Sequence, residues 1–248
     1  MIEVRDLQKS FGTQKVLDGV SFRIENGESV VIIGRSGGGK SVLLKHLIGL
    51  IQPDAGEVLI DGENIRPLNE RQLLRVRRKF GMVFQGAALF DSMSVAENVA
   101  FGLRRHEDYT EAEIARRVSE ALAMVDLPGT ENKNPDELSG GMRKRVGLAR
   151  AIIYEPQIVL YDEPTTGLDP IVSDSIDQLM IRVRDHLKVT TVVVTHDMRT
   201  ARRVGPRVLM LHDKKIYASG APEEFFISKD PVVRQFVDGV ADPKENCF

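Results

Sequence analysis

The stretch GRSGGGKS at 34–41 combines residue types suited to binding phosphate. Glycines let consecutive backbone N–H groups turn toward one point, and such a nest at the start of a helix binds anions. Lys40 supplies a cation that reaches phosphate oxygens, and the Ser41 hydroxyl is a ligand suited to Mg²⁺. The apolar run SVVIIG precedes the loop, and helical spacing follows it. This context favours a nucleotide phosphate loop over a glycine-rich turn with a chance lysine.

Two neighbouring carboxylates, Asp162 and Glu163, end the apolar run IVLY. In a parallel sheet the carboxyl ends of the strands meet at the ligand crevice, where the phosphate loop also lies. We therefore expect Asp162 to hold Mg²⁺ through water and Glu163 to polarise an attacking water. Taken alone, such a pair is commonly a solvated strand end, but downstream of a phosphate loop the metal-binding interpretation is favoured. His196 follows the run TTVVVT and is expected at the same crevice, in contact with a γ-phosphate.

A second glycine element, LSGGM at 138–142, opens another helix. Ser139 is a suitable N-cap, and Gly140 and Gly141 leave the helix N-terminus open to an anion. The element belongs to a helical segment between the phosphate loop and the acidic pair, so one chain has no obvious way to fold it onto its own nucleotide. A head-to-tail pair of chains would let each lend this element to the nucleotide of the other. Spacing alone fits a simple capped helix equally well.

The elements that must position these residues follow from periodicity. The first sixty residues alternate like antiparallel strands with glycine turns, and the middle is helical, with capping-box spacing at Ser94 and Thr110. From residue 157 strands and helices alternate, including a helix over 170–187. This pattern predicts a parallel α/β fold with a helical insertion. We place one nucleotide-binding domain at 1–222, the insertion at about 86–155 and a C-terminal helical tail at 223–248.

The composition excludes some classes of protein. The 248 residues carry a net charge of −2, which offers no bulk attraction for nucleic acid or an anionic membrane. No apolar run approaches the ~18 residues of a membrane-spanning helix, and no secretory signal is evident. The lone Cys247 fits a reducing cytoplasm. The basic runs at 71–80 and 142–150 lack interleaved aromatics, so we expect solvated helix faces. For 223–237 we expect a helix packed on its own domain, with a dimer or regulator contact as the alternative.

The sequence resembles the nucleotide-binding subunit of an ATP-binding cassette (ABC) transporter, from about Ile2 to Gln235. Six motifs carry the resemblance: Walker A at 34–41, a Q-loop at 84–85, the LSGGM signature at 138–142, Walker B at 158–163, a D-loop at 167–169 and a switch histidine at 196. The resemblance implies an α/β P-loop NTPase (ABC ATPase) core with an antiparallel β subdomain and an inserted α-helical subdomain.

The same resemblance implies a role for each motif residue. ATP would be bound by Phe11, which would stack on adenine, and by Gly34, Ser36, Gly37, Gly38, Gly39, Lys40, Ser41 and Val42. The Mg²⁺ ligands would be Ser41, Gln85 and Asp162. The residues acting in hydrolysis would be Glu163, His196 and Gln85. In a homodimer, each γ-phosphate would be clamped by the other chain's Ser139, Gly140, Gly141 and Met142, and Asp169 would contact across the dimer.

A finer resemblance concerns the transported substrate. Three segments, at 34–50, 84–103 and 137–152, are similar to the ATPases of MCE-type (Mla-like) phospholipid transport systems. This similarity implies a peripheral subunit on the cytoplasmic face of a bacterial inner membrane, bound to an integral membrane permease and an MCE-domain substrate-binding protein. Whether a small regulatory subunit also binds is left open. Arg35 and Met142 stand where many family members carry Pro and Gln, and neither change removes a catalytic group.

Two other functions are weighed against this reading. The ATPase of an importer for amino acids or other small solutes would carry nearly the same core motifs. A non-transport ABC protein acting on ribosomes or DNA is less favoured, because the chain has one cassette and no sustained heptads.

Overall fold

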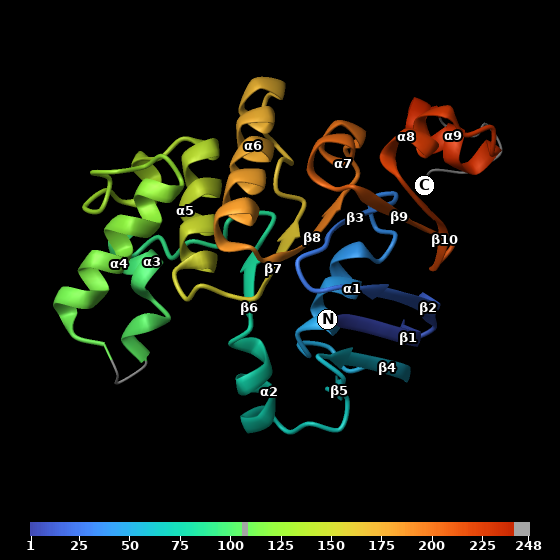
Figure 1. The fold of residues 1–248 in the computed structure, drawn as a ribbon, viewed down its shortest axis with the longest axis horizontal. Helices are drawn as coiled ribbons and strands as arrows, with labels where there is room; N and C mark the ends of the chain where they lie inside the picture. The colour runs from blue at the N-terminus through green and yellow to red at the C-terminus, as the bar shows by residue number, and fades with distance from the viewer. Residues whose placement is uncertain (106–108, 241–248) are drawn as a thin grey trace.

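A computed structural model describes residues 1–105 and 109–240, so Cys247 and the end of the predicted tail lie outside the described residues. Two sheets meet around α1, Lys40–Leu47, the helix that follows the glycine loop (Figure 1). The first sheet has the order β2-β1-β4-β5 and is antiparallel. Its strands are β1 Ile2–Phe11, β2 Gln14–Ile24, β4 Ala55–Ile60 and β5 Glu63–Asn64.

The second sheet has the order β10-β9-β3-β8-β7-β6. Its strands are β3 Ser29–Ile33, β6 Phe80–Val83, β7 Ile158–Asp162, β8 Thr190–Thr195, β9 Arg207–His212 and β10 Lys215–Gly220. All neighbours pair in parallel except β10, which runs antiparallel to β9 at the edge. Every residue of β3, β7 and β8 is buried. Burial on both faces explains why these strands read as continuous apolar runs.

The period of two along β3 divides the core into two clusters. Val30 and Ile32 pack toward α1 and the antiparallel sheet. Val31 and Ile33 join the cluster on the opposite face, which includes residues of α5, α6 and α7. The phosphate loop, which follows β3, is therefore anchored to a strand buried on both sides.

Among the described residues between β6 and β7, three α-helices gather on one side of the molecule, at the left of Figure 1. They are α3 Val95–Ala100, α4 Glu111–Met124 and α5 Gly140–Ile152. Ser94 caps α3 with the reciprocal Glu97 bond expected of a capping box, and Thr110 caps α4 through the N–H of Glu113. These helices fall within the segment predicted as the insertion, and the domain bounds themselves stay a prediction.

The described residues form five further α-helices. They are α2 Glu70–Arg77, α6 Pro170–Leu187, α7 Met198–Val204, α8 Pro222–Ile227 and α9 Pro231–Asp238. The segment predicted as one tail helix forms two, because Asp230 caps a new helix with Pro231 at its first position. Phe225 and Val233 are buried in the core cluster of the main domain. The tail helices therefore pack on their own domain, as favoured above.

Candidate functional site

The loop at 34–39 owes its shape to glycine. Gly39, immediately before α1, has φ +95°, a conformation that side chains rarely adopt. A Cβ on Gly34 would lie 2.5 Å from the carbonyl oxygen of Leu211 in β9. The loop thus turns tightly and lies close to a neighbouring strand, at the carboxyl end of the sheet where ligands bind.

A cavity of about 430 Å³ opens beside this loop. It is lined by Phe11, Val16, Ser36, Gly37, Gly39, Lys40, Ser41, Val42, Gln85, Glu163, Thr166 and His196. Most residues predicted to bind ATP or to act in hydrolysis therefore line one cavity. Phe11 is half exposed at the end of β1, which leaves its ring accessible for the predicted stacking. Gly34, Gly38 and Asp162 belong to the adjoining loop and strand and are not part of the lining.

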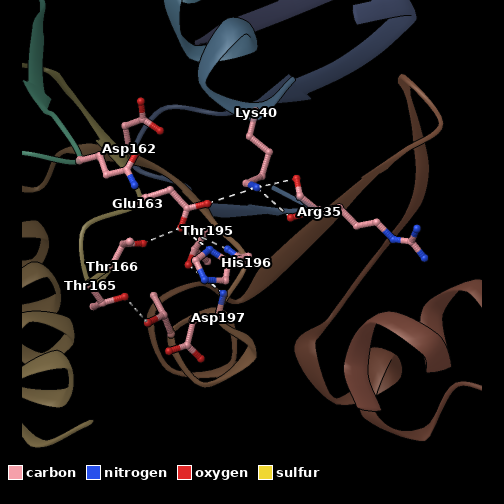
Figure 2. Close-up of polar contacts among 12 residues, drawn as sticks. Arg35, Lys40, Asp162, Glu163, Thr165, Thr166, Thr195, His196 and Asp197 are labelled. Atoms are coloured by element: carbon pink, nitrogen blue, oxygen red, sulfur yellow. Dashed lines mark hydrogen bonds and ion pairs between the residues drawn. The ribbon is translucent and has the colours of Figure 1, made fainter. Parts of the chain in front are cut away.

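Lys40 lies at the centre of the polar contacts shown in Figure 2. Its ammonium donates to the carbonyls of Gly34 at 2.8 Å and Arg35 at 3.0 Å. The same Nζ lies 3.2 Å from Oε1 of Glu163. Lys40 is 5% exposed. A buried ammonium at the mouth of the loop supplies the positive charge that a phosphate chain requires.

The predicted metal ligands lie together. The Ser41 hydroxyl donates to Oδ1 of Asp162 at 2.7 Å, which joins the start of α1 to the end of β7. Gln85 lines the same cavity from the segment after β6. Hydroxyl, carboxylate and amide oxygens are the hard ligands that Mg²⁺ prefers, so this donor set fits the ion.

Glu163 is held by several groups at once. Its backbone has φ +48°, a left-handed conformation uncommon outside glycine, and its N–H donates to the carbonyl of Val194. Oε2 accepts from Thr166 Oγ1 at 3.2 Å and lies 2.8 Å from His196 Nδ1. Figure 2 shows the carboxylate between Lys40 and His196. The side chain predicted to activate water is thus oriented by the phosphate-loop lysine and by the switch histidine.

The signature element lies elsewhere in the same chain. Ser139 caps α5 by accepting from Met142 N, as predicted. A Cβ on Gly141 would lie 2.7 Å from Val172 Cγ1 of α6, so glycine permits close packing of the two helices. Among the described residues that line the cavity, none comes from 138–142. Asp169 caps α6 through two backbone N–H groups. This placement agrees with the expectation that the signature does not reach its own nucleotide.

The prediction of solvated basic faces is wrong for α5. Lys144 is buried and donates to the backbone carbonyls of Gln85 and Glu163. Burial lowers the pKa of Lys144, while the charges of Glu163 and Asp162 oppose that shift. Arg150 likewise donates to the carbonyls of Ala87 and Ala88.

A signal for Lys144 exists in the sequence. It precedes Leu148 by four residues and Ala151 by seven, and both are buried on the same helix. Lys144 lies on the apolar stripe of the helix and is buried with it. Arg143 is exposed, as the prediction of a solvated basic face requires. On α2 the prediction of a solvated basic face holds better, because Arg71 and Arg75 are exposed. Thr166, which bonds Glu163, was also missed.

The comparisons with known proteins decide the family. The model of the ABC transporter family matches residues 17–166. The chain belongs to the ABC transporter family. This ABC ATPase superposes on the dimeric structure of MJ0796, a bacterial ABC transporter cassette, with a TM-score of 0.83 and 34% identity, covering 90% of this chain and 99% of that one. A structure of the same cassette bound to ADP and Pi gives 0.82 with the same identity and coverage.

Three curated relatives of the chain carry different descriptions. It is 40% identical over 242 residues to MlaF of Escherichia coli K12, an intermembrane phospholipid transport ATP-binding protein, covering 98% of this chain and 90% of MlaF. It is 45% identical over 259 residues to trigalactosyldiacylglycerol 3 of Arabidopsis thaliana, covering 98% and 74%. The probable ribonucleotide transport protein mkl of Mycobacterium tuberculosis H37Rv is 45% identical over 238 residues, covering 96% of this chain and 66% of mkl. The chain therefore spans just under two thirds of mkl.

Across the part of the chain that the structure describes, no helix is both long and apolar enough to cross a membrane.

Proposed function

We propose that this ABC ATPase hydrolyses Mg-ATP to drive phospholipid transport through a membrane permease. The observation that carries the hydrolytic part is the convergence of Lys40, Gln85, Glu163 and His196 on one cavity from four separate segments. Phosphoryl transfer to water depends mainly on positioning and charge stabilisation, and these four groups supply both.

Each residue has a proposed part in the reaction. Lys40 and the loop N–H groups bind the β- and γ-phosphates, and Phe11 stacks on the adenine. Glu163 accepts a hydrogen bond from the attacking water and so orients it toward the γ-phosphate. His196 contacts the γ-phosphate and holds the Glu163 carboxylate at 2.8 Å. Ser41, Asp162 and Gln85 would hold Mg²⁺, which neutralises phosphate charge when bound.

The proposal includes a second copy of the chain. The signature residues 139–142 lie outside the cavity of their own chain, whereas a helix N-terminus with bare glycines suits a γ-phosphate. The related cassette MJ0796 is a dimer. In a head-to-tail dimer each chain would supply Ser139, Gly140 and Gly141 to the partner's ATP, and two ATP would be enclosed.

The phospholipid part rests on similarity to MlaF over 98% of this chain. The relative from Arabidopsis thaliana is also named for a glycerolipid. On this basis we place the subunit at the cytoplasmic face of the inner membrane, with a permease and an MCE-domain protein as partners. The name of the mycobacterial relative favours a different cargo, a ribonucleotide. A small-solute transporter is therefore the second candidate.

Affinity purification from native membranes in mild detergent tests the cargo, with an untagged strain as the control. Mass spectrometry then identifies the co-purifying proteins and lipids. An MCE-domain protein, a multi-spanning permease and enriched phospholipid are the expected result. A permease with a soluble solute-binding protein and no lipid above the control would refute the phospholipid assignment and leave the ATPase intact.

A further inference from the structure

Lys144 lies where three distant parts of the chain meet. It is the fifth residue of α5, the helix that begins at the signature glycines and packs against β6. Its ammonium donates to the backbone carbonyl of Gln85 in the Q-loop and, at 3.4 Å, to that of Glu163 after β7. The side chain is 7% exposed. One buried cation therefore connects the signature helix, the Q-loop and the residue proposed to orient water.

Burial of an ammonium is unfavourable unless other groups compensate for its lost hydration. Here the two carbonyls and the nearby charges of Asp162 and Glu163 provide that compensation. Within the described part of the chain, Lys144 Nζ forms no salt bridge, and hydrogen bonds to two backbone carbonyls position it instead. Such contacts fix the direction of a peptide group, and with it the course of the chain on either side.

The peptide that Lys144 contacts is conformationally unusual. Glu163 has φ +48°, which costs energy for a residue with a side chain and persists only when its surroundings hold it. Its N–H is bound by the carbonyl of Val194, and its carbonyl is bound by Lys144. Together these two bonds set the orientation of the Cα–Cβ bond and so the direction of the carboxylate.

We propose that Lys144 is a positioning residue for ATP hydrolysis, which ties the signature helix to the Q-loop and orients the Glu163 carboxylate. The inference rests on the proposed role of Glu163. It predicts that losing the ammonium lowers turnover while leaving ATP binding unchanged, because Lys144 does not line the ATP cavity. A lysine that only stabilised the fold would not separate kcat from KM in this way.

The test uses Lys144→Met, which keeps the length and apolar stem but removes the donors. ATPase rates of the full chain are measured across ATP concentrations, together with MgADP binding and thermal unfolding. We expect kcat to fall at least about tenfold, with KM and MgADP affinity within about twofold of wild type. Lys144→Arg, which keeps the charge and several donors, is expected to restore at least about half of kcat. Lys133→Met, an exposed lysine before α5, is the matched control and is expected to match wild type.

Several results would overturn the proposal. The proposal fails if the kcat of Lys144→Met stays within about twofold of wild type. It also fails if KM rises and MgADP binding is lost along with kcat. If Lys144→Met does not fold, Lys144→Gln replaces it, since its amide is one bond shorter and reaches one carbonyl at most. An intermediate kcat is then expected, and a wild-type kcat would refute the idea.

A double-mutant cycle separates this inference from the proposed function. In single-turnover reactions, Lys144→Met is expected to change the residual rate of Glu163→Gln by less than about twofold, because the two act through one carboxylate. An equal loss in both backgrounds would show that Lys144 acts without Glu163. If Glu163→Gln alone keeps wild-type turnover, the role proposed for Glu163 fails, whereas a wild-type rate for Lys144→Met alone removes only Lys144.

Discussion

At the scale of single residues, Glu163 joins the phosphate loop to the switch histidine. Its two carboxylate oxygens face different partners, Lys40 at 3.2 Å and His196 at 2.8 Å. A phosphate chain bound at the loop would compete for Lys40, which would release Oε1 to accept from water. In the proposed mechanism, nucleotide binding at Lys40 would therefore free the Glu163 carboxylate to accept a hydrogen bond from water.

Glu163→Gln tests the base directly. The amide has nearly the same shape but accepts a proton far more weakly, so we expect kcat to fall by about 100-fold or more with ATP still bound. Steady-state ATPase assays give the rate, and size-exclusion chromatography with ATP is expected to show a persistent dimer. Near-normal hydrolysis by this variant would remove Glu163 from the mechanism.

Lys40→Ala tests the phosphate contact. A charge-assisted hydrogen bond to phosphate contributes about 1.5–3 kcal/mol, so we expect ATP affinity to fall by about tenfold or more. Titration with a fluorescent ATP analogue measures the dissociation constant. Lys45→Ala, on the same helix but outside the cavity lining, serves as the control. Unchanged affinity of Lys40→Ala would contradict the phosphate-loop assignment.

The placement of a side chain could be predicted where a sequence motif constrains the backbone. It could not be predicted as well where burial in the folded chain determines the contacts of the side chain. Ser41 and Asp162 were predicted as metal ligands from different motifs, and they lie 2.7 Å apart. The sequence predicts a solvated lysine at position 144, because the basic run at 142–150 lacks interleaved aromatics. Its two partners are carbonyls 59 and 19 residues away in sequence, which local patterns do not reveal.

At the scale of elements, α6 and α7 meet at a buried acid. Asp177 of α6 is 3% exposed and accepts from the Thr200 hydroxyl of α7 at 3.1 Å. Burial raises its pKa to about 7, the Thr200 bond opposes this shift, and the charge of Asp197 adds to it. Thr165, beside the acidic pair, lies 3.4 Å from the Thr200 hydroxyl. The acid thus lies at the contact between α6 and α7.

This acid predicts a pH-dependent stability. Because the folded pKa of Asp177 lies above its unfolded value of 3.8, the native state favours the protonated form. Its contribution is fully present below about pH 4 and is lost as the pH rises through about 7. Relative to Asp177→Asn, we expect the free energy of unfolding of wild type to fall by a few kcal/mol, on the order of 1.4 per pKa unit, between pH 4 and 8. Urea unfolding gives the free energy of unfolding of wild type and of Asp177→Asn at each pH. The same pH dependence in the two proteins would contradict the prediction.

Elements with a strong period were predicted well, and the edge strands of the six-stranded sheet were not. The helix predicted over 170–187 is α6 with the same bounds, because Asp169 and Pro170 define its start. The short strand β6 at one edge and β10 at the other were not predicted. Within β6, Gly81 weakens the strand pattern, yet a Cβ there would lie 2.3 Å from the Ala151 carbonyl. The close approach of α5 to β6 requires glycine at position 81, and the same glycine makes the strand hard to predict from sequence.

At the scale of the whole molecule, the parallel α/β core was predictable because its central strands are buried on both faces. The contact between the tail helices and the core was favoured and is observed through Phe225 and Val233. The structure of one chain does not show which phosphate loop each signature element serves. The phosphate loop and the signature are each formed, yet the signature does not line the cavity of its own chain.

Mixed dimers test whether the signature acts on the partner's ATP. Lys40→Ala disables the phosphate loop, and Gly140→Asp places a carboxylate where we expect a γ-phosphate. Gly140 is exposed, and a Cβ there would meet only Leu168 Cδ2 at 3.4 Å, so the fold should tolerate the change. An acid in the first turn also suits the helix dipole. Each variant alone is expected to be inactive.

An equal mixture of the two variants gives a different expectation. Half of the dimers would be mixed, and each would contain one site with an intact phosphate loop and an intact signature, so about a quarter of wild-type ATPase activity should return if the sites act independently. If each signature served its own chain, every chain would carry one defect and no activity would return. Activity measured against mixing ratio, peaking near equal amounts, therefore distinguishes a shared site from a self-contained one.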